Sequence, residues 1–392
     1  MKFDLFSSLE QGTDSHGVPR SPADTLGNYL RTVEVAESCR YWCSWTAESH
    51  YSTIEQRRLL GEAAEIPNWP GEICSNTDFF STALAAASRH PGIDFGSAIT
   101  NIVCAGGPVV AAERIHLLDA LASAMKIPNT FHIGMAGGRF DYLYRIAGLR
   151  PRNQAEHRQW NEVKTAIAAE AAEIVVRLVQ GDALGSDELT DRVLVDPNTS
   201  SHEPLARRWT FETTRVAQSP ATERIQLYAA SHNRELYTEL NQYRPVRALN
   251  LSITPSAEID RNQHHLAGVY HRNGGAWARE YLPQTALVFL DADRNTARRT
   301  AETKLSRYWS AMLGTVPPNK VANSASNSLV GTPAEVAEQI TTRYYPDDRL
   351  MLWFDFQYRE LQEVHDAIRR FAADVIPLLP EEYQRGALRE SR

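Results

Sequence analysis

The chain has 392 residues, of which 43% are hydrophobic, and a formal net charge of −7. This composition argues against disorder, and the scattered lysines and arginines argue against a nucleic-acid partner, which would leave a basic stripe. No run of about 18 apolar residues occurs, so no membrane span is expected, and the N-terminus lacks a signal-peptide pattern, so we expect a cytoplasmic protein.

Eight segments have the apolar, β-branched character of strands buried on both faces. They are residues 3–6, 42–47, 93–100, 131–135, 225–230, 248–253, 286–290 and 350–354. Helical periodicity falls between them, at residues 25–39, 79–88, 108–122, 160–179, 235–242, 258–270, 296–312, 334–342 and 360–376.

Strands that alternate with helices predict a parallel sheet. Eight such units predict an α/β fold of the (β/α)8 TIM-barrel type, as one domain over residues 1–392. The competing doubly wound sheet would place GxGxxG after the first strand, and SSLEQG stands there instead.

The connections between these elements are unequal. Two of them, residues 49–76 and 181–223, are long insertions in the βα loops, which is uncommon unless such loops are functional or disordered. Residues 315–330 are rich in Asn and Ser, and we expect them to be mobile. The last fifteen residues are expected to form a frayed tail.

Polar side chains follow several predicted strands, at the ends where barrel enzymes carry their chemistry. Glu48 and His50 are two apart after the second strand and point the same way, so they form either an acid–base pair or a structural bond. Thr100 and Asn101 follow the third strand. No third ligand stands at a suitable spacing, and no CxxC occurs, so no metal is expected.

A glycine-rich turn follows the fourth strand. It either lets the backbone approach a ligand or only turns the chain. It consists of Gly134, Met135, Ala136, Gly137 and Gly138, with Tyr142 behind it. Ser231 follows the fifth strand in a helix N-cap sequence, a geometry that also suits a phosphate group.

Several segments resemble one known family in their order and spacing. They are Phe3-Asp4-Leu5-Phe6, Ala47-Glu48-Ser49-His50-Tyr51, Ala112-Glu113 with Leu118-Asp119-Ala120-Leu121, the turn Gly134–Gly138, residues 329–337, and Phe371-Ala372 with Val375-Ile376-Pro377. Together they resemble the bacterial luciferase-like flavin-dependent monooxygenases, a family of TIM barrels, from end to end. Ser49 stands where the Glu-His-His motif of that family has its first histidine. If that histidine is the catalytic group of the family, the resemblance implies that His50 has its role or that the role is absent.

The resemblance implies reduced FMN from a separate flavin reductase, O2, and a C4a-(hydro)peroxyflavin that oxygenates a small organic substrate. It places Glu48 and His50 beside the reacting carbon as catalytic residues, Ala47, Thr100 and Asn101 near the flavin ring, the turn Gly134–Gly138 and Tyr142 along it, and Ser231 at the phosphate. It makes the two insertions candidate lids, and it implies a homodimer or homotetramer.

Three alternatives stay open. The same fold serves oxidoreductases that use the deazaflavin F420 and need no O2. A non-catalytic, flavin-binding subunit is the second alternative, because Ser49 replaces a motif histidine. A metal-dependent barrel hydrolase is the third, against which the scarcity of clustered His and Asp speaks. The substrate is not readable, beyond an apolar pocket lined by Trp45, Trp209 or Phe356.

Overall fold

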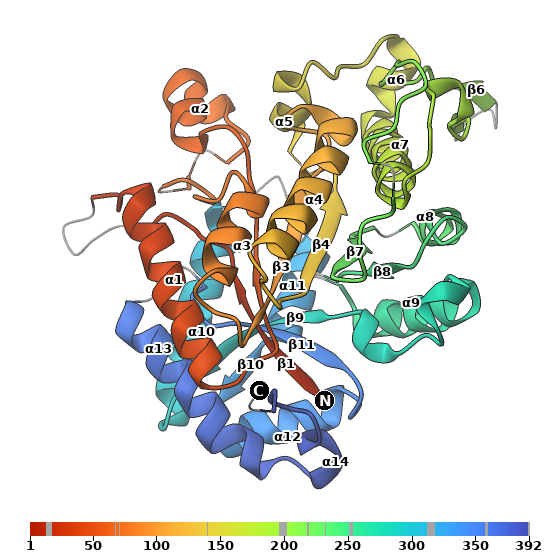
Figure 1. Ribbon diagram of the computed structural model, residues 1–392. Helices are drawn as coiled ribbons and strands as arrows, with labels where there is room; N and C mark the ends of the chain where they lie inside the picture. The colour runs from red at the N-terminus through yellow and green to blue at the C-terminus, as the bar shows by residue number, and fades with distance from the viewer. Residues whose placement is uncertain are drawn as a thin grey trace.

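The coordinates are a computed structural model, which describes all of residues 1–392 except 13–17, 67, 70, 139, 196–201, 218, 232, 251–253, 312–317, 357–359 and 391–392. Strands and helices alternate along the described chain, and the long helices surround one parallel sheet (Figure 1). The barrel strands are β1 (Lys2–Ser7), β2 (Cys43–Thr46), β3 (Asp94–Asn101), β4 (Phe131–Ala136), β7 (Ile225–Ala229), β8 (Val246–Ala248), β9 (Gln284–Leu290) and β11 (Arg349–Trp353).

Within the sheet, the eight barrel strands run in the order β9-β11-β1-β2-β3-β4-β7-β8, and every neighbouring pair of them is parallel. A parallel bridge between Asn250, just after β8, and Gln284 of β9 joins the two ends. The predicted (β/α)8 fold is therefore confirmed. The strand expected at 248–253 begins earlier, at Val246, and residues 251–253 lie outside the described residues.

The predicted helices are present with small shifts at their ends. They are α1 (Pro22–Ser38), α3 (Phe79–Ala87), α4 (Gly107–Ala124), α7 (Trp160–Gln180), α8 (Arg234–Leu240), α9 (Ser256–Val269), α10 (Arg294–Ala311), α12 (Pro333–Arg343) and α13 (Leu361–Arg370). Local chemistry fixes several starts: the side chains of Ser21, Asp78 and Thr332 accept hydrogen bonds from the first turns of α1, α3 and α12. The helix predicted to reach residue 376 ends at Arg370 and continues as a π-turn and a 3-10 turn.

Elements that periodicity did not predict fill the connections. The first insertion contains α2 (Thr53–Leu60), and the second contains the hairpin of β5 (Val193–Val195) and β6 (His202–Pro204). Two short helices, α5 (Asp141–Ile146) and α6 (Gln154–Arg158), precede α7. Helix α11 (Pro318–Asn327) and strand β10 (Leu329–Gly331) occupy the described part of the segment expected to be mobile, whose mobility stays a prediction.

The expectation of a frayed C-terminal tail is wrong. Helix α14 (Glu381–Gln384) packs at the N-terminal end of the barrel, close to the N-terminus (Figure 1). Phe3 N–H donates to the Ala387 carbonyl at 3.3 Å, and the Arg389 guanidinium lies 3.1 Å from an Asp94 carboxylate oxygen. The tail thus covers the strand starts.

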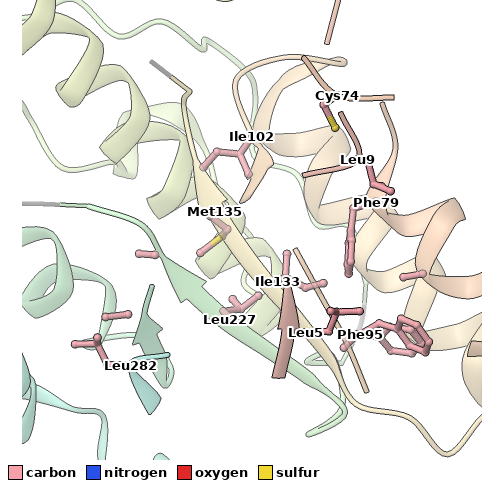
Figure 2. Packing of buried hydrophobic residues seen from close by; sticks show 14 of the residues in the cluster. Leu5, Leu9, Cys74, Phe79, Phe95, Ile102, Ile133, Met135, Leu227 and Leu282 are labelled. Carbon is pink, nitrogen blue, oxygen red and sulfur yellow. The ribbon is translucent and has the colours of Figure 1, made fainter. Parts of the chain in front are cut away.

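Two apolar clusters follow from the alternation of side chains along the strands. The larger one lies between the sheet and the helices, where Leu5, Phe95, Ile133 and Leu227 meet residues such as Phe79 of α3 (Figure 2). The smaller one fills the barrel interior, and its members alternate with those of the outer cluster along the same strands.

Candidate functional site

The carboxylate of Glu48 connects three elements at the C-terminal ends of β2 and β3. One of its oxygens accepts from Asn101 N–H at 3.1 Å and lies 2.9 Å from His50 Nε2. The other accepts from Phe79 N–H, at the first turn of α3, at 2.9 Å. The Glu48 side chain is only 2% exposed. The predicted pair is therefore formed, and Glu48 is fully engaged in holding the loop.

The same contact sets the form of the His50 ring. Because a carboxylate only accepts, Nε2 carries the proton that faces Glu48, which leaves Nδ1 as the nitrogen able to accept a proton. Asn76 also secures this loop, because its side chain donates to the Ala47 carbonyl at 2.9 Å and its carbonyl accepts from Ser49 N–H at 3.0 Å.

Tyr142 lies close to Ser49, a residue of the same loop. The Tyr142 hydroxyl is buried near Ser49 without a hydrogen-bond partner among the described residues, and burial raises the pKa of Tyr142 to about 12. Tyr142 is 2% exposed, so its hydroxyl stays protonated at neutral pH. The residue that departs from the family motif thus faces a buried hydrogen-bond donor.

Asn101 organises the turn that follows β3. Its side-chain oxygen accepts from Val103 N–H at 3.1 Å and from Cys104 N–H at 3.2 Å. Its amide nitrogen faces Gly138, where a Cβ would lie 2.8 Å from it. Gly138 has φ +76°, so glycine is required there for both its backbone and its space. These contacts give Asn101 a structural role.

Small residues line one side of the barrel mouth. Ile133 and Met135 of β4 belong to the outer cluster, so Gly134 and Ala136 face the interior. A Cβ on Gly134 would come 2.3 Å from the Ser97 carbonyl oxygen, so no larger residue fits. Ala47, Ala98 and Ala230 extend this surface across β2, β3 and β7. We call these five residues, Ala47, Ala98, Gly134, Ala136 and Ala230, the small-residue face.

Thr100 stands beside the small-residue face at the end of β3. It is 3% exposed, and its hydroxyl has no hydrogen-bond partner among the described residues. A buried hydroxyl without a partner is unfavourable unless a ligand or water supplies one. The face therefore combines space for a flat group with a polar atom that lacks a partner.

Aromatic side chains line the other side of the mouth. Phe6 contacts Trp353 edge-on at 4.8 Å between ring centroids, and Trp353 contacts Phe356 at 4.9 Å. Tyr308 of α10 and Phe289 of β9 contact Phe356 at 4.8 and 6.2 Å. We call these five residues the aromatic wall.

A polar layer lies below both surfaces, inside the barrel. Trp45 crosses the interior over Gly96, where a Cβ would lie 2.3 Å from the indole, and its Nε1 donates to Asp4 at 2.6 Å. Arg349 donates to the same Asp4 oxygen at 2.6 Å. The Trp45 ring stacks on His132, whose pKa burial holds well below its usual value. His132 is therefore neutral, and this layer closes the floor of the site.

The first insertion is fixed to the mouth at two points. Trp69 is 1% exposed and meets Tyr308 edge-on at 5.6 Å between centroids. The Glu65 carboxylate accepts from the N–H groups of Asp141 and Tyr142 at 2.9 and 2.8 Å, at the start of α5. The insertion therefore spans from the β4–α5 loop to α10.

The second insertion packs along α7. Glu170 accepts from the N–H groups of Arg208 and Trp209, and Glu173 accepts from Thr190 N–H. The Trp209 indole nitrogen would lie 2.8 Å from a Cβ on Gly107, at the start of α4. Trp209 packs against the outer cluster here, and its place in a substrate pocket stays a prediction. The role of this insertion as a lid stays a prediction.

Other predicted site residues have structural explanations. The Met135 side chain lies in the outer cluster with Ile133 and Leu227 (Figure 2), and its contact with a cofactor stays a prediction. Gly137 makes room for the Tyr144 hydroxyl, which a Cβ would approach to 2.3 Å. The Ser231 hydroxyl accepts from Asn233 N–H at 3.0 Å, so it shapes the turn before α8, and its phosphate role stays a prediction.

The prediction named Phe356 but missed the rest of the aromatic wall. Phe6, Phe289 and Trp353 lie on predicted strands, and their alternation with Leu5, Val288 and Leu352 of the outer cluster was the available signal. Ser7, which shares a hydrogen bond with Asp355 next to a cavity of about 70 Å³, was also missed. Their pairing joins the ends of β1 and β11 and is visible only in three dimensions.

Within the described ranges, no three His, Cys, Asp or Glu side chains gather as a metal site. No helix in the described part of the chain has the length and apolar character needed to span a bilayer.

Comparison with protein-family models and with curated protein sequences finds no match. Among solved structures, the monooxygenase RslO1 from Streptomyces bottropensis aligns with a TM-score of 0.68 at 16% identity, over 96% of this chain and 99% of that one. The oxygenating constituent of 3,6-diketocamphane monooxygenase from Pseudomonas putida, in complex with FMN, aligns with 0.60 at 14%, over 97% and 99%. An F420-dependent secondary alcohol dehydrogenase aligns with 0.58 at 11%, over 97% and 99%.

At these identities the likeness is one of fold. The chain has the barrel found in flavin-dependent monooxygenases and in F420-dependent enzymes, in agreement with the fold that the resemblance predicted.

Proposed function

We propose that the chain is a flavin-dependent monooxygenase of the luciferase-like type, which uses reduced FMN from a separate reductase and O2 to oxygenate a small organic substrate. The observation that carries this proposal is the mouth of the barrel: a small-residue face with the unpartnered Thr100 hydroxyl, opposite an aromatic wall. A flat isoalloxazine ring fits against such a face, and two structures that are named as monooxygenases and are similar over nearly the whole chain share the fold.

The residues present fit a flavin, which would supply the oxygen chemistry. Thr100 would donate to or accept from the ring, and Ala47, Gly134 and Ala136 would let it approach the strand ends. His50 would take up or release a proton at Nδ1, with Glu48 fixing the opposite side of its ring as a positioning residue. Tyr142 would act as a neutral hydrogen-bond donor, and the aromatic wall would exclude water.

A second candidate is an F420-dependent oxidoreductase, favoured by the similarity to the alcohol dehydrogenase. Both candidates use the same surfaces at the mouth. They differ in the cofactor and in the need for O2.

Titration of the purified protein with FMN, with reduced FMN under anaerobic conditions and with F420, followed by admission of air, tests the proposal. We expect tight binding of reduced FMN and a transient absorbance after air enters. Preference for F420 without oxygen consumption would move the protein to the second candidate. Binding of no flavin would refute both.

Replacing His50 tests the residue assignment. For His50→Ala we expect flavin affinity to stay within about twofold, while the rates that follow admission of air change about 10²-fold or more, as for a lost acid–base group. His90→Ala is the matched control, because His90 also pairs with a glutamate, Glu37, at 2.8 Å, but next to β3's start. Equal effects of the two variants would contradict a proton-transfer role for His50.

A further inference from the structure

Trp353 is the one member of the aromatic wall whose polar atom is buried without a partner. The residue is 9% exposed, it belongs to the interior cluster, and its Nε1 has no hydrogen-bond acceptor among the described residues. By contrast, the indole N–H of Trp45 in the polar layer below has an acceptor, because it donates to Asp4 at 2.6 Å. A buried N–H without an acceptor is unfavourable, so a missing acceptor marks a place where a ligand can supply one.

The surroundings of this N–H define what kind of ligand fits. Phe6 and Phe356 hold the Trp353 ring edge-on from two sides, so its orientation is fixed. The other members of the interior cluster are apolar, and Asp4 and Arg349 of the polar layer below pair with each other. An ionic group would lose its hydration against this wall without gaining a counter-ion.

We propose that Trp353 is a specificity-determining residue: its indole N–H donates to a carbonyl oxygen of an uncharged, ring-containing substrate held against the aromatic wall. The aromatic edges and faces accommodate rings, and the single donor fixes which end of the substrate points toward β11. The inference rests on the proposed function for the direction in which the substrate faces the cofactor. The binding of a neutral ketone to the wall does not depend on that function.

Binding of three small probes to the FMN-loaded protein tests the inference by calorimetry. The probes are 1-tetralone, which has rings and a carbonyl, tetralin, which lacks the acceptor, and 2-naphthoate, which carries a charge. We expect 1-tetralone to bind about three- to tenfold more tightly than tetralin, as for one net hydrogen bond, and 2-naphthoate to bind most weakly.

The variant Trp353→Phe removes the donor and keeps an aromatic ring. We expect it to bind the ketone and the hydrocarbon equally, with unchanged FMN affinity, since Trp353 lies opposite the small-residue face. Trp42→Phe is the control, because the Trp42 indole N–H donates to the Gly386 carbonyl at the other end of the barrel and its loss should leave the preference for the ketone intact.

Two outcomes would overturn the inference: equal binding of ketone and hydrocarbon by the unmodified protein, or an unchanged ketone preference in Trp353→Phe. Failure of the proposed function would look different, because FMN itself would then not bind. The same probes added to the flavin-free protein would in that case still report on the wall. Thermal unfolding of Trp353→Phe checks that the variant is folded.

Discussion

Among single residues, Glu48 stands out because its carboxylate makes three contacts at the mouth of the barrel. It accepts from two backbone N–H groups and faces His50, while it is nearly inaccessible to solvent. A buried donor that loses its acceptor costs about 1–3 kcal/mol. The residue that the sequence predicts as catalytic is therefore also a structural clamp between β2, β3 and α3.

We expect Glu48→Gln to lower the free energy of unfolding by about 1–3 kcal/mol, because the new amide group must face one of the three donors. Urea denaturation measures the change. Glu55→Gln is the control: Glu55 pairs with Arg58 at the surface, with a half-exposed side chain, and its replacement should change stability by less than about 0.5 kcal/mol. Equal stabilities of the two variants would show that the Glu48 contacts are not needed.

The Cys104 thiol leads to a prediction of how the stability of the fold depends on pH. Burial, and then the negative charge of Glu48, raise the pKa of this thiol to about 12 from an ordinary value of 9.0. The folded protein keeps the proton where the unfolded chain loses it, so stability is unaffected below pH 9 and falls as the pH rises from 9 toward 12.

We expect urea unfolding to show this loss between pH 9 and 10, at no more than about 1.4 kcal/mol per pH unit from this group, and Cys104→Ala to have a shallower slope. Cys74, whose pKa burial also raises to about 12, would supply part of what remains. A slope identical in protein and variant would mean that Cys104 titrates normally.

Among the larger elements, the first insertion is held in place by contacts that its sequence does not predict. Glu65 accepts from two N–H groups at the start of α5 and lies 3.0 Å from Arg145. Trp69 and Ile66 are buried at the same time. These contacts attach the first insertion to α5 and α10 at the mouth of the barrel.

We expect Glu65→Ala to release the insertion from α5, because the start of that helix loses its acceptor. Hydrogen exchange followed by mass spectrometry should then show faster exchange in residues 53–66 and 141–146, with the strands unchanged. Glu62→Ala is the control, because Glu62 is exposed in the 3-10 turn Gly61–Ala63, shortly before Glu65. Equal exchange in both variants would assign the docking to Trp69 and Ile66 alone.

At the scale of the whole molecule, the two termini close the barrel at the end opposite to the site. Leu379, Tyr383 and Ala387 are buried under the strand starts, and Arg389 reaches Asp94. Contacts between residues about 300 positions apart in sequence therefore stabilise the ring of strands.

We expect truncation after Leu379 to lower the free energy of unfolding by about 3 kcal/mol or more, since it deletes the buried Tyr383 and Ala387, uncovers the strand starts beneath them and removes a partly buried ion pair. Denaturation in urea checks this. Arg385→Ala is a control, because the Arg385 side chain pairs with Glu381 on the surface. An unchanged midpoint for the truncated chain would restore the expectation of a frayed tail.

The order of apolar runs along the chain was enough to predict the barrel and the positions of its polar residues. Apolar runs such as 93–100 and 131–135 identify buried strands because the hydrophobic effect acts on the composition of each run, and the ends of those runs locate Glu48, His50, Thr100 and Gly134 at the mouth. The boundaries of α1, α3 and α12 follow from capping side chains close in sequence.

The contacts of these residues could not be predicted from the chain and are visible in the folded protein. The Glu48 contacts with Asn101 and Phe79, the outward direction of Met135, and the aromatic wall join residues that are distant along the chain. A pattern of spacing reports which face of a strand a residue occupies. It does not report which strands or insertions meet across the barrel, because that depends on closure of the whole ring and on how each loop is packed.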